Sequence, residues 1–448
     1  MIALKSIIST VDKRSVKVYK NIVALFTIKG AAMLIGFVVV PLTLHYLDST
    51  RYGIWITIST FFSWLALFDI GLGNGLRNRL AESVAKNDLT KARIYVSTTY
   101  AGLAIIFTGV YVLFYITNLF LNWTSILNTS VEFKDELSLL VRIVFLFFCI
   151  QFVLNLINTI ALAKQEPALT QAFGLLSNIL SLVGIYLLTE YTSGRLIYLG
   201  VLLAGVPLVT GLTINIVLFN TRYKSIKPSI KFVHFSELKS LLNIGLKFFL
   251  LQIIALIFYQ TNIIIIAQLF GPVEVTPYSI AFRYFGIASF VFTTILTPYW
   301  SAITDAYTKG EISWIIKVMG SLKRIWLGLF VFVVVLFFLS NILIHIWIGD
   351  YVKVDSQLYF VMGVYVLIIS LQAIYSSFLN GVGVVMIQFY TAVALAFFHI
   401  PLAIFFGRLY GIKGTLFSLI FFGIIQVIVL EIQYRKIINH SDSGIWSK

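Results

Sequence analysis

Long apolar stretches of about 20 residues, separated by short loops, run through the whole chain. Of its 448 residues 59% are hydrophobic and only 11% are charged, a balance that is not typical of water-soluble domains. Stretches of this length cross a bilayer as helices, because lipid offers no hydrogen-bond partner to the backbone. The strict alternation expected of barrel strands is absent. The sequence therefore predicts an all-α, polytopic membrane protein.

The apolar windows predict about 12 membrane-spanning helices. We expect them at 22–47, 52–73, 95–121, 138–163, 171–189, 196–219, 241–269, 276–299, 324–348, 357–381, 386–406 and 412–431. The predicted organisation is a basic N-terminal segment (1–21), a first six-helix bundle (22–219), a linker (220–240), a second six-helix bundle (241–431) and a tail (432–448). Residues 1–21 lack the apolar core and cleavage site of a signal peptide, so we expect them to stay on the chain.

Most of the 33 lysines and arginines fall on the N-terminal segment, the C-terminal tail and alternate loops. Positive charge in short loops resists translocation, which places these loops and both termini in the cytoplasm. The net charge of +15 is then mainly a signal for membrane orientation, and binding to nucleic acid is not expected.

The two halves of the chain match when one is shifted onto the other. Leu80–Asp88 falls on Ile303–Glu311 with an acid, a lysine and a second acid at the same spacing, and Leu47 falls on Phe270 with the same shift. Each half has six predicted helices, so both halves enter the membrane from the same side. This predicts a parallel repeat whose two bundles rock about a central substrate site by alternating access.

Four cations lie within predicted spans: Lys29, Arg142, Lys247 and Arg283. A charge at the centre of a membrane helix costs about 2.5–3.5 kcal/mol on insertion scales, so such a residue usually faces protein or a water-filled cavity. We expect Lys29 and Arg283, the deeper two, to bind an anionic substrate. Arg142 and Lys247 are candidates for the same role, although a side chain near a helix end also reaches the interface by snorkelling.

Asp69 is the acid placed furthest inside an early predicted helix, and it is followed by Gly71, Gly73 and Gly75. One hypothesis gives Asp69 and Arg77 a role in gating or in proton or sodium coupling. The alternative is an ordinary salt bridge at a helix end, with glycine permitting a tight turn.

Several classes of function find no support in the sequence. It has no phosphate-binding loop of the G-x-x-x-x-G-K-[ST] type, its five histidines show no metal-binding spacing, and its one cysteine, Cys149, lies in an apolar run. No predicted outer loop is long enough to hold a catalytic domain. We therefore expect a protein that is not an enzyme and has no cofactor or metal, driven by a gradient, with proton or sodium coupling as an open alternative.

The strongest local pattern lies between residues 52 and 93. It consists of Tyr52-Gly53-Ile54-Trp55, Phe68-Asp69-Ile70-Gly71-Leu72-Gly73-Asn74-Gly75-Leu76-Arg77-Asn78, Ala81-Glu82, Asn87-Asp88 and Ala92-Arg93. This pattern resembles the polysaccharide-transport family, the O-antigen flippases, within the superfamily that also contains multidrug exporters and lipid II flippases. Asn380-Gly381-Val382-Gly383 and Gln388 resemble a later loop of that family, but Val384 stands where the family commonly has lysine.

The resemblance implies two six-helix bundles in a V. It also implies that their central cationic cavity moves a polyprenyl-diphosphate-linked oligosaccharide from the cytoplasmic to the outer leaflet of a bacterial inner membrane. It implies as partners the anionic lipid-linked oligosaccharide, membrane lipids and the polymerase or ligase of the glycan pathway, with a monomer sufficient for transport. Two other hypotheses stay open: a cation-coupled multidrug antiporter on the same fold, and a membrane-embedded glycan enzyme.

Overall fold

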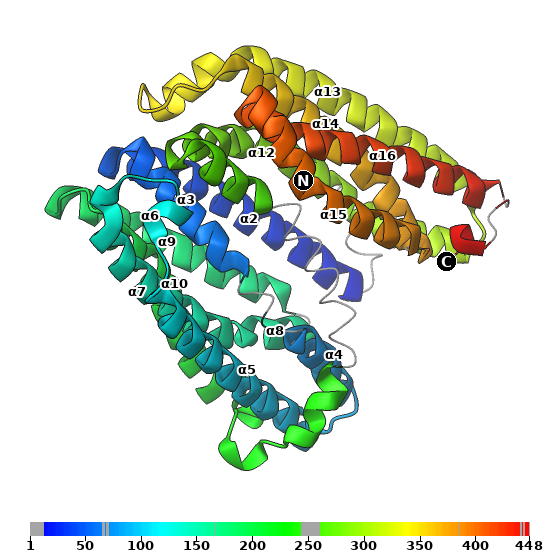
Figure 1. The fold of residues 1–448 in the computed structure, drawn as a ribbon. Coiled ribbons are helices and arrows are strands. Elements are labelled where there is room, and N and C mark those ends of the chain that lie inside the picture. The colour runs from blue at the N-terminus through cyan, green and yellow to red at the C-terminus, as the bar shows by residue number, and fades with distance from the viewer. Residues whose placement is uncertain are drawn as a thin grey trace, which may run out of the picture. The chain divides into compact units, whose positions relative to one another are not determined.

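The computed structural model describes residues 13–64, 68, 71–164, 166–242, 260–384, 386–439, 441 and 444–447. All regular elements in these ranges are helical, and ten of the helical segments are long and apolar enough to cross a membrane. The chain is thus an all-helical multi-pass membrane protein, as the sequence predicts (Figure 1). Of the predicted spans, 52–73 and 241–269 are not among the ten. The first contains a helix of only 15 residues, and much of the second lies outside the described residues.

The chain divides into two compact units. The first unit comprises residues 1–47, 62–123 and 131–250. Its helices are α2 (Lys13–Tyr46), α4 (Leu72–Ala85), α5 (Leu89–Asn118), α7 (Lys134–Leu154), α8 (Leu156–Ala163), α9 (Pro167–Tyr191) and α10 (Leu196–Asn220), with the short turns η2 (Val131–Phe133), η3 (Lys224–Ile226), η4 (Ile230–Phe232) and η5 (Phe235–Glu237). In this unit α2 packs on α9, while α7 packs on α5 and α10.

The second unit comprises residues 48–61, 124–130 and 251–448. It holds most of α3 (Ser49–Ser63), the helix Gln260–Phe270, α12 (Pro272–Thr308), α13 (Ile312–Ile348), α14 (Ser356–Val382), α15 (Met386–Tyr410), α16 (Ile412–Ile438) and η6 (Gly444–Ser447). The short helix α6 (Trp123–Ile126) begins in the first unit and ends in the second. In the second unit α14 packs on α12, α13 and α16 (Figure 1).

The repeat is visible in the geometry of two equivalent turns. α4 ends at Ala85 and α12 at Thr308, and in each turn the second residue after the helix has a left-handed backbone: Asn87 with φ 56° and Gly310 with φ 73°. The next residue, Asp88 in one turn and Glu311 in the other, directly precedes a long helix. Its amide N–H donates to the carbonyl oxygen five residues earlier. The Asp88 amide donates to Ser83 at 2.9 Å, and the Glu311 amide donates to Ala306 at 2.9 Å. The alignment made from sequence alone therefore matches the backbone residue by residue.

Several predicted helix boundaries were wrong. Within the predicted span 52–73, α3 ends at Ser63. The predicted loop 74–94 is largely α4, whose first residue follows Gly71 in the left-handed region at φ 79°. The predicted span 138–163 divides at Asn155 into α7 and α8. Most of the predicted loop 300–323 is helical, because α12 continues to Thr308 and α13 begins at Ile312. Hydropathy locates the membrane boundary, whereas a helix continues beyond it until its backbone is capped.

Candidate functional site

Arg283 lies well inside α12, about 11 residues and roughly 16 Å from the start of the helix at 1.5 Å per residue. Its side chain is half-buried, and the Tyr52 hydroxyl on α3 lies within electrostatic reach of its guanidinium. The Thr276 hydroxyl of α12 donates to the Ser49 carbonyl oxygen of α3 at 2.7 Å. The packing of α3 on α12 therefore fixes the helix that carries the deep arginine.

Lys29 and Arg142 both lie in the first unit, on helices with different packing partners. Lys29 is exposed on α2. Arg142 on α7 is half-buried, donates from Nη2 to the Ser138 hydroxyl at 3.2 Å, and has a buried Nε without a hydrogen-bond partner. A buried guanidinium N–H without an acceptor is costly and suits an incoming anionic oxygen. The role of these cations in substrate binding remains a prediction.

The other three predicted site residues are less informative. Lys247 and Asp69 lie outside the described residues. Arg77 is exposed on α4. The gating hypothesis for Asp69 and Arg77 therefore stays a prediction.

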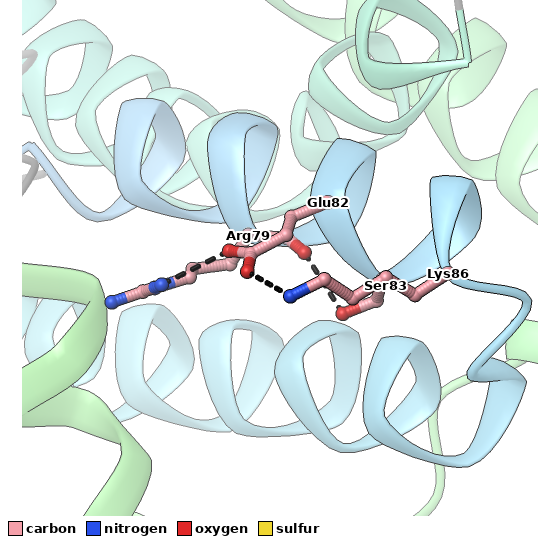
Figure 2. A network of polar contacts seen from close by, with 4 residues as sticks. All are labelled: Arg79, Glu82, Ser83 and Lys86. Atoms are coloured by element: carbon pink, nitrogen blue, oxygen red, sulfur yellow. Dashed lines mark hydrogen bonds and ion pairs between the residues drawn. The ribbon is translucent and has the colours of Figure 1, made fainter.

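A polar network occupies the end of α4, where the sequence resembles the flippase family (Figure 2). Glu82 accepts hydrogen bonds from Arg79 at 3.0 Å and from Lys86 at 2.7 Å, and the Ser83 hydroxyl donates to the Arg79 carbonyl oxygen at 2.9 Å. Lys86 and Arg79 hold the pKa of the Glu82 carboxyl below its usual range. Exposed ion pairs stabilise a fold little. The network thus serves mainly to orient side chains at the end of α4.

A second, more buried cluster joins the end of α10 to the start of α9. Glu166 accepts from Arg222 at 2.7 Å and from the hydroxyl of the buried Tyr223 at 2.7 Å. Burial, together with this hydrogen bond, raises the pKa of Tyr223. Lys164 lies 4.9 Å from the centre of the Tyr223 ring, and burial lowers its pKa. The cluster holds the first residues of the predicted linker against the first unit.

Replacing Tyr223 by phenylalanine should lower the stability of the first unit by about 1–3 kcal/mol, because Glu166 loses a buried hydrogen-bond donor. The expected result is a lower melting temperature of the detergent-solubilised protein. Tyr307→Phe is the control, since Tyr307 is exposed at the end of α12. Equal melting temperatures for the two variants would show that the bond does not stabilise the unit.

Sequence reasoning missed a cluster around Lys323 on α13, in the second unit. The Lys323 ammonium lies 5.3 Å from the centre of the Tyr375 ring, 5.9 Å from that of Tyr434 and 3.9 Å from a Glu431 carboxylate oxygen. Glu431 also accepts from Arg435 at 2.7 Å. Lys323 fell in a predicted loop because the start of α13 is too polar for a hydropathy window. The sequence did offer one sign of this cluster, because Glu431 and Arg435 are four residues apart, a spacing at which an acid and a base pair on one helix.

A buried polar cluster in the same unit was also missed. The Ser418 hydroxyl is 3.0 Å from His399 Nδ1, and it donates to the Thr415 carbonyl oxygen at 3.0 Å. Asn262 Nδ2 lies 3.5 Å from that oxygen and 3.4 Å from the Tyr278 hydroxyl, and its own side-chain oxygen is buried without a hydrogen-bond partner. Single polar residues in apolar windows do not reveal such a cluster, because its members come from four helices. Within the described ranges, no group of three or more His, Cys, Asp or Glu side chains could hold a metal ion.

Solved membrane transporters share this fold. An inward-facing multidrug resistance MATE family transporter of the MOP superfamily matches 93% of this chain and 95% of its own, with a TM-score of 0.74 and 14% identity. The lipid II flippase MurJ in an inward closed conformation matches 92% of this chain and 87% of its own, with a TM-score of 0.73 and 16% identity. At these identities the likeness concerns the fold, which is the two-repeat fold of that superfamily.

Proteins of similar sequence give a narrower assignment than the shared fold does. Two proteins assigned as O-antigen transporters are similar to this chain: one from Salmonella typhimurium, 25% identical over 61% of this chain and 62% of its own length, and one from Salmonella typhi, 24% identical over 67% and 69%. The match thus covers less than two thirds of the first relative. The family model described as polysaccharide biosynthesis protein matches residues 18–304, which include the α4 network and the deep Arg283. On that match, over more than half of its length, the chain belongs to the polysaccharide biosynthesis protein family.

Proposed function

We propose that this protein is a flippase that moves a polyprenyl-diphosphate-linked oligosaccharide from the cytoplasmic to the outer leaflet of a bacterial inner membrane. The observation that carries the proposal is the charge of the membrane spans. Arg283 lies about 11 residues inside α12 and Arg142 about eight residues inside α7, whereas α2, α5, α10, α13, α14 and α15 contain no acidic residue. Such helices favour an anionic ligand over a cationic one.

A diphosphate suits these cations chemically. The guanidinium of arginine binds two phosphate oxygens at once, and lysine supplies a more compact charge. Arg283 and Arg142 would bind the diphosphate, and Lys29 and Lys247 would contribute as the two bundles alternate. The names of the relatives as O-antigen transporters and of one structural neighbour as a lipid II flippase support this class of substrate.

The direction of transport follows from charge. With both termini in the cytoplasm, an inside-negative potential favours outward movement of the diphosphate by about 2.3 kcal/mol per charge per 100 mV. The chain itself then needs no nucleotide, and consumption of the glycan outside would draw the reaction forward. One chain contains both repeats, so a monomer would suffice.

The alternative is a cation-coupled multidrug antiporter, which the likeness to a multidrug resistance transporter favours. Such a protein needs carboxylates within its spans to bind drug cations and coupling ions. In the described membrane-spanning helices the acids lie near helix ends, at Asp135 and Glu136 of α7, Glu190 of α9, and Glu274 and Asp305 of α12, while Glu431 of α16 is paired with Arg435. The antiporter is therefore the weaker candidate.

Deletion of the gene in its own bacterium tests the proposal. Lipid-linked oligosaccharides are extracted and labelled from one side of the membrane. The proposal predicts that they accumulate on the cytoplasmic side while surface glycan is lost, and that the wild-type gene restores both. Normal surface glycan without accumulation would contradict it, and drug and ion fluxes would then test the antiporter.

A further inference from the structure

The predicted linker, residues 220–240, lies along the side of α5. The Arg93 Nε of α5 donates to the Lys227 carbonyl oxygen at 2.8 Å, and the Arg93 guanidinium lies 4.2 Å from the centre of the Phe232 ring. Two further hydrogen bonds extend the attachment: the Ser229 amide donates to the Ser97 hydroxyl at 3.1 Å, and the His234 amide to the Thr98 hydroxyl at 3.0 Å. This part of the linker is therefore fixed to α5.

These contacts set the depth of the linker. Ser97 and Thr98 are buried and lie roughly 12–14 Å along α5 from its first residue, Leu89, at 1.5 Å per residue. The sequence predicts that the apolar span of α5 begins near residue 95. On that prediction, the linker lies at the level where α5 passes from the polar headgroups into the hydrocarbon.

Apolar side chains on this segment point away from the protein. Ile230 is 92% exposed and Phe235 is 53% exposed, although the neighbouring Ile226 is buried. In water the apolar surface of so exposed an isoleucine is unfavourably hydrated, whereas at the membrane interface the side chain reaches the acyl chains. The exposure of Ile230 and Phe235 therefore fits a lipid environment.

The charge of the linker indicates which lipids surround it. Lys224 and Lys231 are exposed, and among the described residues no acid forms an ion pair with either of them. Glu237 is the acidic residue of the linker, against five lysines and arginines. Basic side chains beside interfacial apolar ones are typical of segments that bind anionic phospholipids.

We propose that residues 224–235 form an interfacial anchor that binds anionic phospholipid headgroups through Lys224 and Lys231, with Ile230 and Phe235 inserted at the acyl boundary. The anchor would lie in the leaflet on the basic side of the protein. It is independent of the glycan substrate, because it uses none of the cations within the spans.

Site-directed spin labelling tests the depth of the anchor. Cys149 is the single cysteine and is buried, so Cys149→Ser provides a cysteine-free background. Nitroxides are attached at Ile230→Cys and Phe235→Cys, with Thr90→Cys as the exposed control at the start of α5. The protein is placed in nanodiscs of phosphatidylglycerol and phosphatidylcholine. We expect labels 230 and 235 to collide more with oxygen than with a water-soluble nickel complex, and label 90 to show the reverse.

The charge requirement has its own measurement. Native mass spectrometry should show several-fold less phosphatidylglycerol retained by Lys224→Gln/Lys231→Gln than by the matched control Lys86→Gln/Lys91→Gln, whose lysines are exposed on the same unit. Equal retention would overturn the headgroup assignment. Nickel accessibility at 230 and 235 equal to that at 90 would overturn the anchor and place the segment in water. Neither result would bear on whether the protein is a flippase.

Discussion

Replacing Arg283 by glutamine is expected to reduce glycan export by about ten- to a hundredfold. A hydrogen bond to a charged partner contributes about 1.5–3 kcal/mol, and each 1.4 kcal/mol changes an equilibrium or rate about tenfold. Arg283 is half-buried and lies deep in α12, so a cation on the protein surface does not readily take over its contact with the diphosphate. The measurement is surface glycan in a deletion strain that carries the variant at wild-type protein levels.

Arg408→Gln is the matched control, because Arg408 is exposed in the last turn of α15. Arg283→Lys should retain part of the activity, since it keeps the charge but not the planar fork of donors. Arg142→Gln and Lys29→Gln are expected to cause smaller losses. Normal export by all three glutamine variants would exclude these residues as diphosphate ligands.

Replacing Gly53 by alanine is expected to destabilise the second unit strongly. A Cβ atom at Gly53 would lie 1.7 Å from the Pro272 carbonyl oxygen, a backbone atom that is not free to move aside. Overpacking commonly costs about 1–3 kcal/mol, and a clash with backbone belongs at the upper end of that range. The expected result is a lower melting temperature and an aggregated fraction in size-exclusion chromatography.

Gly286→Ala is the control for that experiment. Gly286 lies on α12 in the same unit, and a Cβ atom there would meet nothing within 4 Å. The added methyl group should leave the melting temperature unchanged or raise it, because alanine favours helix. A Gly53→Ala protein as stable as Gly286→Ala would show that α3 and α12 are not closely packed at this point.

Much of the fold could be predicted because few physical requirements, chiefly hydrophobicity and length, determine where a membrane helix forms. Hydropathy and length locate the spans, and the matched turns near Asn87 and Gly310 follow from a repeated pattern of residues. The helix ends could not be predicted in the same way. The start of α4, for example, follows the left-handed backbone of Gly71, which a hydropathy average does not detect.

The sequence indicates which cations are candidates for the site, but not how their side chains are arranged. The cost of burying charge makes Lys29 and Arg283 the first candidates from the sequence, with Arg142 and Lys247 after them. The partners and exposure of these side chains depend on helix rotation, which the sequence does not give. Lys323 shows the opposite difficulty. Its neighbours Tyr375 and Tyr434 come from α14 and α16, and no local pattern joins three helices that are distant in sequence.

Translocation by the purified protein in proteoliposomes tests the central claim most directly. Vesicles contain a polyprenyl-diphosphate oligosaccharide with a fluorescent sugar, and a membrane-impermeant reductant bleaches the label in the outer leaflet. The account predicts that wild-type protein exposes nearly all of the label, while Arg283→Gln protein leaves the inner-leaflet fraction largely protected. The same protected fraction with wild-type protein as in protein-free vesicles would contradict the assignment as a flippase.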